Sequence, residues 1–170
     1  MDILGRSPVP WPLLVTGKLA YAGSALFFLV KIFYPESMLY DSPHTRAAGA
    51  SLYLAGLAVV IAALVHLGES AAVGLPDRET KLKTRGLYRF SRNPVYLGAF
   101  TMCTGSCLWA IHPLNIILFA ITVPIHLSIV NREEEFLEQR FGQEWLEYRR
   151  TVPRFIGWHG GSAPGSKSDT

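Results

Sequence analysis

Long stretches of this chain carry no charged residue, and polar segments separate them. No Lys, Arg, Asp or Glu occurs in residues 47–67 or in residues 96–130, and residues 19–34 contain only Lys31. A helix of about 20 apolar residues is long enough to cross the hydrocarbon core of a bilayer. Residues 96–130 are long enough for two shorter crossings, and the sequence Ile-His-Pro-Leu-Asn at 111–115 supplies a break between them. The pattern therefore predicts four membrane spans, at about 13–34, 47–67, 95–110 and 113–131.

Beyond residue 130 the pattern changes to that of an amphipathic helix. Leu137, Phe141, Trp145 and Tyr148 recur at spacings of four, four and three, which places them on one helical face. We expect this segment to lie along the membrane surface or to fold back over the bundle, with a bend at Gly142. The predicted fold is therefore all-α. It is a polytopic membrane bundle of about four helices, whose last two spans form a hairpin, followed by a cytoplasmic amphipathic helix.

Length and composition fit one membrane domain. The chain has 170 residues, of which 49% are hydrophobic and 17% are charged. We expect a single domain at residues 1–156, with the motif-bearing core at 80–156, and a disordered Gly- and Ser-rich tail at 157–170. Cys103 and Cys107 lie four residues apart on a predicted span, where they suit packing better than a disulfide or a metal site. No metal is therefore expected.

The basic residues indicate how the chain is oriented. With four spans, the N-terminus, the 68–94 loop and the C-terminal tail share one side, and most of the 16 Lys and Arg residues fall there. Because cytoplasmic loops are enriched in Lys and Arg, these segments are predicted to be cytoplasmic, and we expect a bacterial inner-membrane protein. The net charge of +3 then reflects topology and contact with lipid headgroups. No nucleic-acid-binding pattern accompanies it, so no nucleic-acid partner is expected.

A cationic turn precedes the third predicted span. Residues 86–98 read Gly-Leu-Tyr-Arg-Phe-Ser-Arg-Asn-Pro-Val-Tyr-Leu-Gly. Pro94 directs Asn93 away from helical dihedral angles and suits the first turn of the following helix. The free N–H groups of that helix start, together with Arg92, are suited to holding a carboxylate at the cytoplasmic interface. The alternative is that Arg89 and Arg92 are orientation anchors and that Pro94 only starts a helix.

Three consecutive acidic residues, Glu133, Glu134 and Glu135, follow the fourth predicted span. Neither the topology rule nor the helix dipole favours acidic groups there, and neighbouring like charges repel one another. A ligand cation or Arg92 would offset them, and a solvated helix face is the alternative. His126 lies within the span, on the same helical face as Glu133. It either lines a ligand pocket or is a hydrogen-bonded core residue.

Together, the two segments resemble the signature of membrane-embedded methyltransferases of the isoprenylcysteine carboxyl methyltransferase and phospholipid methyltransferase superfamily. The family pattern is Gly-x-Tyr-x-x-x-Arg-His-Pro-x-Tyr-x-Gly, an apolar hairpin, and Glu-Glu-x-x-Leu with Phe-Gly four and five residues later. The matching residues are Gly86, Tyr88, Arg92, Pro94, Tyr96, Gly98, Glu133, Glu134, Leu137, Phe141, Gly142, Tyr148 and the Val-Pro-Arg-Phe-Ile ending at 152–156. One position departs from the pattern, because Asn93 replaces the His and cannot titrate.

The resemblance implies S-adenosylmethionine as the methyl donor, bound without a Rossmann fold between the hairpin and the C-terminal segment. It implies that Arg92 and Glu134 are catalytic. The residues implied to bind the cofactor are Gly86, Tyr88, Arg92, Asn93, Pro94, Tyr96, Gly98, His126, Glu133 and Glu134. Glu133 or Glu134 would hold its ammonium or ribose hydroxyls, and Arg92, Asn93 and the helix start would hold its carboxylate.

The methyl acceptor stays open. A lipophilic small molecule or a lipidated acceptor, such as a prenylated cysteine carboxylate, is the expected partner within the membrane lipids. Phospholipid amines and thiols are alternatives. Two other functions compete with methyl transfer: an NADPH-binding protein similar to sterol reductases, which share a related hairpin, and a non-catalytic membrane scaffold. The sequence carries no signal for the oligomeric state.

Overall fold

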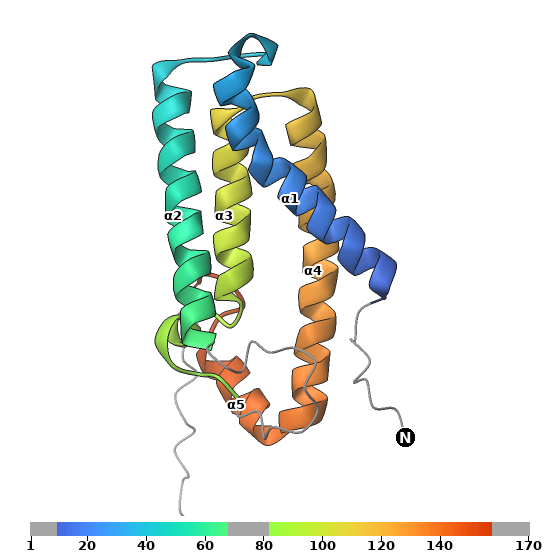
Figure 1. The fold of residues 1–170 in the computed structure, drawn as a ribbon. Coiled ribbons are helices and arrows are strands. Elements are labelled where there is room, and N and C mark those ends of the chain that lie inside the picture. The colour runs from blue at the N-terminus through green and yellow to red at the C-terminus, as the bar shows by residue number, and fades with distance from the viewer. Residues whose placement is uncertain (1–9, 68–81, 158–170) are drawn as a thin grey trace, which may run out of the picture.

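The computed structural model describes residues 10–67 and 82–157. Within these ranges every regular element is helical, and the prediction of an all-α fold is confirmed (Figure 1). The α-helices are α1 (Trp11–Phe33), α2 (Pro43–Leu67), α3 (Pro94–Trp109), α4 (Pro113–Phe141) and α5 (Gln143–Thr151). Two 3-10 turns, η1 (Pro35–Ser37) and η3 (Gly86–Arg89), lie in the connections. The predicted tail beyond residue 157 lies outside the described residues.

Proline and glycine set the helix boundaries. Pro94 and Pro113 open α3 and α4, where a missing N–H costs no intrahelical hydrogen bond. The His112 side chain caps α4 by accepting a hydrogen bond from the Leu114 N–H (3.2 Å). Gly142 has a φ of +52°, in the left-handed region that glycine adopts readily, and it separates α4 from α5. The bend predicted at this glycine is confirmed.

Helices α2 and α3 pack closely because glycines line their contact. These glycines are Gly49 and Gly56 on α2, and Gly98 and Gly105 on α3. A Cβ added to Gly98 would lie 2.8 Å from the Gly56 carbonyl oxygen, and one added to Gly105 would lie 2.8 Å from that of Gly49. Small residues let helix backbones approach one another in a membrane. Cys103 of α3 is buried and Cys107 is half-buried, and both are free thiols.

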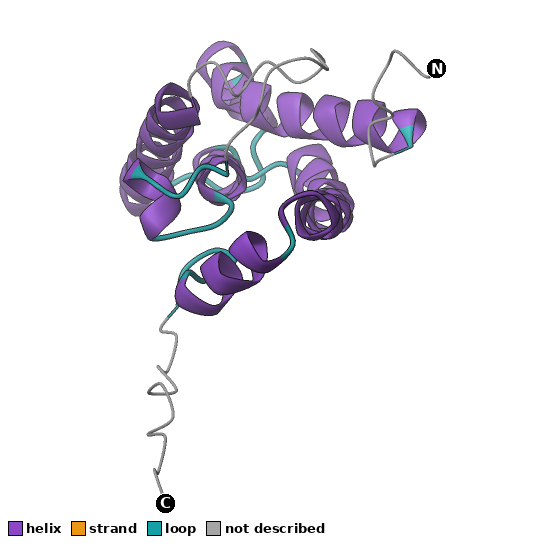
Figure 2. Cartoon of the chain, turned by 90° about the horizontal axis from the view of Figure 1, so that it is seen from below, coloured by secondary structure: helices purple, strands orange, loops and turns teal. Residues whose placement is uncertain are grey.

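The central helix is α3, which contacts α1, α2 and α4 (Figure 2). Buried polar side chains link α1, α3 and α4 to one another. The Ser24 hydroxyl of α1 donates to Asn115 Oδ1 of α4 (2.8 Å), and the Ser106 hydroxyl of α3 donates to the Ser24 carbonyl oxygen (2.5 Å). Asn115 Nδ2 donates to the carbonyl oxygens of Ser106 and Ala110 (both 3.1 Å). These polar groups satisfy one another inside the bundle, as an apolar environment requires.

Three of the four predicted spans have the length and hydropathy of a membrane-crossing helix, namely α1, α2 and α4. Exposed apolar side chains on these helices, such as Leu26, Leu54, Ile61 and Ile117, suit contact with lipid. The predicted third span corresponds to α3, which has 16 residues and a length of about 24 Å. The number of four crossings therefore stays a prediction.

One helix boundary differs from the predicted spans. Helix α2 begins at Pro43 rather than near residue 47. Helix α4 runs from the fourth predicted span through the helical stretch predicted after residue 130, and it ends at Phe141, next to the bend predicted at Gly142. The apolar pattern marks where side chains turn polar, whereas the backbone hydrogen bonds of a helix continue past that point. As a consequence, His126, Glu133 and Glu134 all lie on one continuous helix.

Lys31 is buried near the end of α1 and links three segments at the end of the bundle opposite to α5. Its ammonium donates to Asp41 Oδ1 (2.6 Å) and to the Trp109 carbonyl oxygen (2.6 Å), and it lies 5.0 Å from the Trp109 ring centroid. The hydrogen bond from Lys31 holds the pKa of Asp41 below its usual range. The hydrophobic pattern did not indicate this pair, because Asp41 belongs to a connecting loop.

Removing the carboxylate of the Lys31–Asp41 pair should lower the stability of the fold more than removing the ammonium. Asp41→Asn leaves the buried Lys31 cation without its counter-charge, whereas Lys31→Met leaves an exposed carboxylate that also contacts Arg46 (3.5 Å). We expect Asp41→Asn to lower the thermal unfolding midpoint in detergent clearly more than Lys31→Met. Stabilisation by a carboxylate with a depressed pKa is present above about pH 4 and is lost as the pH falls further, so the deficit of Asp41→Asn should narrow in acid. Equal losses in both variants at neutral pH would contradict this assignment.

Candidate functional site

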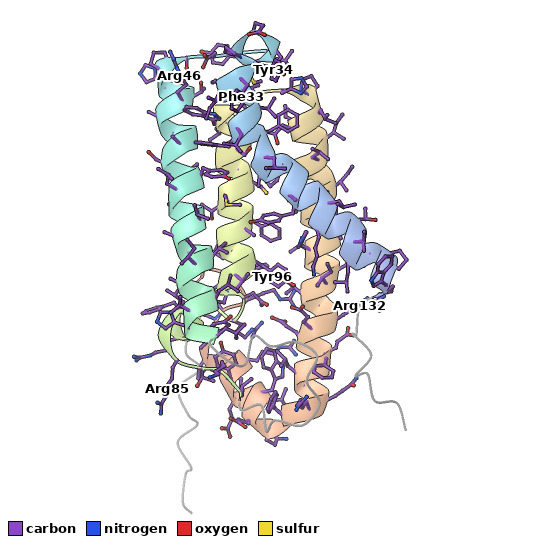
Figure 3. All side chains as sticks on the ribbon, in the orientation of Figure 1. Phe33, Tyr34, Arg46, Arg85, Tyr96 and Arg132 are labelled. Atoms are coloured by element: carbon purple, nitrogen blue, oxygen red, sulfur yellow. The ribbon has the colours of Figure 1, made fainter. Side chains whose placement is uncertain are left out.

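The predicted motif residues meet at one end of the bundle. There, η3, the start of α3, the second half of α4 and the segment after α5 come together (Figure 1). In Figure 3, Tyr96 points from α3 toward α4, far from Tyr34 and Arg46 at the opposite end. The chain therefore brings together two motif segments that an apolar hairpin separates in sequence.

The Glu134 carboxylate is the centre of a buried ion-pair cluster, and its side chain is 7% exposed. Arg154 donates to Glu134 Oε2 from Nε (3.1 Å) and from Nη2 (2.6 Å), and Asn93 Nδ2 donates to Oε1 (3.0 Å). Arg92 Nη2 lies 3.3 Å from Oε1. Three segments of the chain thus share one carboxylate, and a buried acidic group is stable only when it is paired in this way.

Main-chain hydrogen bonds fix the C-terminal segment beside the Arg-Asn-Pro turn. The Arg92 N–H donates to the Pro153 carbonyl oxygen (2.9 Å), and the Asn93 N–H donates to the Arg154 carbonyl oxygen (3.2 Å). The Ser91 hydroxyl also donates to the Arg154 carbonyl oxygen (3.1 Å). Asn93 has non-helical dihedral angles, as expected before a proline, and its N–H is directed out of the helix toward this partner. The segment after α5 is therefore part of the site.

Arg92 is buried and has one donor without a partner. Its side chain is 6% exposed, Nη1 donates to the Arg149 carbonyl oxygen (2.9 Å), and the guanidinium lies 5.6 Å from the Trp145 ring centroid. Burial lowers the pKa of Arg92 below its ordinary value, and the Glu134 carboxylate opposes this shift. Within the described residues, Arg92 Nε and Trp145 Nε1 are buried and have no hydrogen-bond partner. A bound acceptor group would satisfy them.

Glu133, although adjacent to Glu134, contacts a different set of residues. The Tyr96 hydroxyl donates to Glu133 Oε1 (3.0 Å), and the Tyr96 ring packs in a T-shaped arrangement against His126, with centroids 5.9 Å apart. Tyr21 of α1 and Phe100 of α3 make similar contacts with the same imidazole, at 6.1 and 6.3 Å. A carboxylate, a phenol and an imidazole therefore lie together beside an aromatic wall.

A family model described as phospholipid methyltransferase matches residues 44–144, which is more than half of the chain. The chain belongs to the phospholipid methyltransferase family. The resemblance drawn from the two motif segments is therefore confirmed, and membership of this family implies a methyl donor.

Relatives of this family member carry names from the isoprenylcysteine branch. The protein-S-isoprenylcysteine O-methyltransferases of Rattus norvegicus and Homo sapiens are each 29% identical to the chain over 149 residues, covering 82% of this chain and 52% of the relative. Protein-S-isoprenylcysteine O-methyltransferase B of Arabidopsis thaliana is 34% identical over 78 residues, covering 45% of this chain and 40% of the relative. The chain spans about half the length of these relatives, or less. No solved structure matches it.

Four of the residues predicted to bind the cofactor occupy packing or turn positions. Gly98 lies against α2, and Pro94 is fully buried at the start of α3. Gly86 has a φ of +64°, which permits the turn into η3. The Tyr88 carbonyl oxygen accepts a hydrogen bond from the Tyr148 hydroxyl (2.7 Å), and burial raises the pKa of Tyr88 to about 12. These contacts give each residue a structural role, and contact with a cofactor stays a prediction for all four.

The site prediction missed the ionic role of Arg154. The Val-Pro-Arg-Phe-Ile ending was matched to the family pattern, but its Arg was not connected to the acidic cluster. A signal was available, because three consecutive glutamates need more counter-charge than Arg92 supplies, and Arg154 is the basic residue of that ending. Trp145 was placed only on an apolar face, which does not indicate that its indole N–H is unpaired.

Asn93→Asp should loosen the site although the two side chains have nearly the same shape. The new carboxylate would face Glu134 Oε1 across the 3.0 Å that a hydrogen bond now spans. We expect the free energy of unfolding in detergent to fall by about 1–3 kcal/mol. Asn131→Asp is the matched control, because Asn131 Oδ1 already accepts from Arg154 Nη1 (2.8 Å) and a carboxylate preserves that acceptor. If both variants were equally stable, this geometry would be wrong.

Proposed function

We propose that this protein is an integral-membrane enzyme that transfers a methyl group from S-adenosylmethionine to a lipophilic or lipidated acceptor, in the manner of an isoprenylcysteine carboxyl O-methyltransferase. The main support for this proposal is that the two motif segments contact each other in the structure. Asn93 and Tyr96, at the start of α3, are hydrogen-bonded to the adjacent carboxylates Glu134 and Glu133. Family membership supports the reaction class, and the relatives' names support the acceptor class.

The residues at this end of the bundle fit the zwitterionic end of an amino-acid ligand. Arg92 Nε and Trp145 Nε1 are buried donors without a partner, a situation that carboxylate oxygens would correct. The Glu133 carboxylate, which accepts a hydrogen bond from Tyr96, is suited to an ammonium group. In this proposal Arg92, Asn93 and the start of α3 hold the carboxylate of the cofactor, and the Glu133–Glu134 pair serves its ammonium or ribose hydroxyls.

When bound, S-adenosylmethionine would supply an electrophilic methyl carbon, which an acceptor lone pair takes as the carbon–sulfur bond breaks. A carboxylate acceptor is already ionised and needs no base. The protein's part is then to align the two reactants and to exclude water. Tyr96 and Phe100 of α3 and Tyr21 of α1 surround His126 with aromatic rings, which provide such a water-poor wall.

The location of the site supports entry of the two substrates from different phases. The cluster lies at the end of the bundle that carries the α2–α3 connection and the segment after α5. We propose that this end faces the cytoplasm of a bacterial inner membrane, together with the N-terminus. The cofactor would then arrive from water, and the apolar part of the acceptor would arrive from the bilayer.

One observation favours a second candidate, methylation of a phospholipid amine or a thiol. His126 Nδ1 lies 2.8 Å from the Thr122 carbonyl oxygen, which can only accept a hydrogen bond. Nδ1 therefore carries the proton, and in the neutral ring Nε2 is left as an acceptor. An amine or thiol must lose a proton to become a nucleophile, and this nitrogen is suited to receiving it.

The proposal predicts that the detergent-purified protein binds S-adenosylhomocysteine saturably, with a micromolar dissociation constant, in isothermal calorimetry. Arg92→Ala and Glu134→Ala should abolish this binding while the protein stays folded, because each removes a charged group from the buried cluster. Lys83→Ala, in the segment before η3, is the matched control and should bind like the wild type.

NADPH serves as the competing ligand in the same experiment. Normal binding of S-adenosylhomocysteine by both Ala variants would show that the assigned residues are wrong. A folded wild-type protein that binds neither ligand would support a non-catalytic scaffold, and one that binds NADPH would support a reductase-like protein.

A further inference from the structure

Arg154 is the closer of the two cationic partners of Glu134. Its Nε (3.1 Å) and Nη2 (2.6 Å) both donate to Glu134 Oε2, whereas the shortest approach of Arg92 to the carboxylate is 3.3 Å. Arg154 Nη1 donates to Asn131 Oδ1 (2.8 Å), so the same face of α4 holds all three nitrogen atoms of the guanidinium. A planar fork held at three points is a rigid partner for a carboxylate.

Arg92 interacts less closely with Glu134 than Arg154 does. Among the described residues, Arg92 Nε is buried and has no hydrogen-bond partner. The same holds for Nε1 of Trp145, and the Arg92 guanidinium lies over the ring of that tryptophan. Two guanidinium groups against one carboxylate leave this cluster with an excess of one positive charge. The side chains of Arg92 and Trp145 are almost fully buried, and buried donors with excess positive charge favour an anionic ligand.

We propose that Arg154 is a positioning residue of the cofactor site, which neutralises Glu134 so that Arg92 is free to bind the carboxylate of the ligand. This inference rests on the proposed function. Glu134 then acts as a counter-ion within the protein, and Glu133, which faces Tyr96 instead, is the glutamate that receives the ammonium. Without Arg154, Arg92 would pair more closely with Glu134 and would no longer be available to bind the carboxylate of the ligand.

The test compares two ligands in calorimetry: S-adenosylhomocysteine and its decarboxylated analogue, which keeps the ammonium and the nucleoside. The wild type should prefer S-adenosylhomocysteine by about tenfold or more, the usual effect of a charge-assisted hydrogen bond. In Arg154→Gln this preference should fall to about threefold or less, chiefly through weaker binding of S-adenosylhomocysteine. Arg154→Lys should retain part of it, because the charge remains but the fork does not.

Arg149→Gln is the matched control. Arg149 lies on α5, close to Arg154 in sequence, and its side chain forms an exposed ion pair with Glu138 of α4 (3.1 Å) instead of contacting Glu134. This variant should leave the preference unchanged. If Arg154→Gln weakened both ligands equally, Arg154 would have only a structural role and the inference would be overturned. An unchanged preference in Arg154→Gln would overturn it as well.

A double variant keeps the inference testable if Arg154→Gln folds poorly. Glu134→Gln combined with Arg154→Gln removes both charges, so Arg92 is no longer drawn to residue 134. Unlike Ala, Gln at residue 134 keeps an acceptor for Asn93 Nδ2, so binding should persist and the preference for the carboxylate should return. A double variant that binds without this preference would contradict the inference. Failure of the wild type to bind S-adenosylhomocysteine at all would instead refute the proposed function on which the inference rests.

Discussion

A carboxylate buried at the end of an apolar helix bundle must be matched by positive charge, and Glu134 is matched by groups from two other parts of the chain. Arg92 and Asn93 reach it from the turn before α3, and Arg154 reaches it from the segment after α5. Losing any one partner would leave a charge in a poorly solvated place. This requirement fixes the turn, α4 and the C-terminal segment in position relative to one another, and these three segments form the candidate site.

Two adjacent residues of α4 serve different surroundings because successive side chains on a helix point about 100° apart. Glu134 turns toward the C-terminal segment, and Glu133 turns toward Tyr96 of α3. The first position lies in a cluster with excess positive charge and the second beside phenol and imidazole groups, which are the two environments that a zwitterionic ligand needs. The family to which the chain belongs transfers methyl groups. Under the proposed function, this division is how the helical bundle of the described residues would hold the donor.

The sequence predicted the helices and the meeting of the two motif segments, but not the way their charges are shared. The long stretches without charged residues located α1, α2 and α4, because lipid-facing residues must be apolar along a whole span. They misplaced the start of α2, because a helix continues into polar surroundings without a change in its hydrogen bonds. Arg154 and Asp41 were missed for different reasons. Arg154 follows α5 and pairs with Glu134 of α4, a contact that spacing along the chain does not report. Asp41 lies in a connecting loop, where the hydrophobic pattern carries no information about ion pairs.

The most direct test of this account is a double-mutant cycle on the free energy of unfolding in detergent, without ligand, using Glu134→Gln, Arg154→Gln and the double variant. Two hydrogen bonds between charged groups join these side chains at 3.1 and 2.6 Å. The account predicts a coupling energy of about 1.5 kcal/mol or more. Additive effects, with a coupling below about 0.5 kcal/mol, would show that the pair does not hold the C-terminal segment to α4.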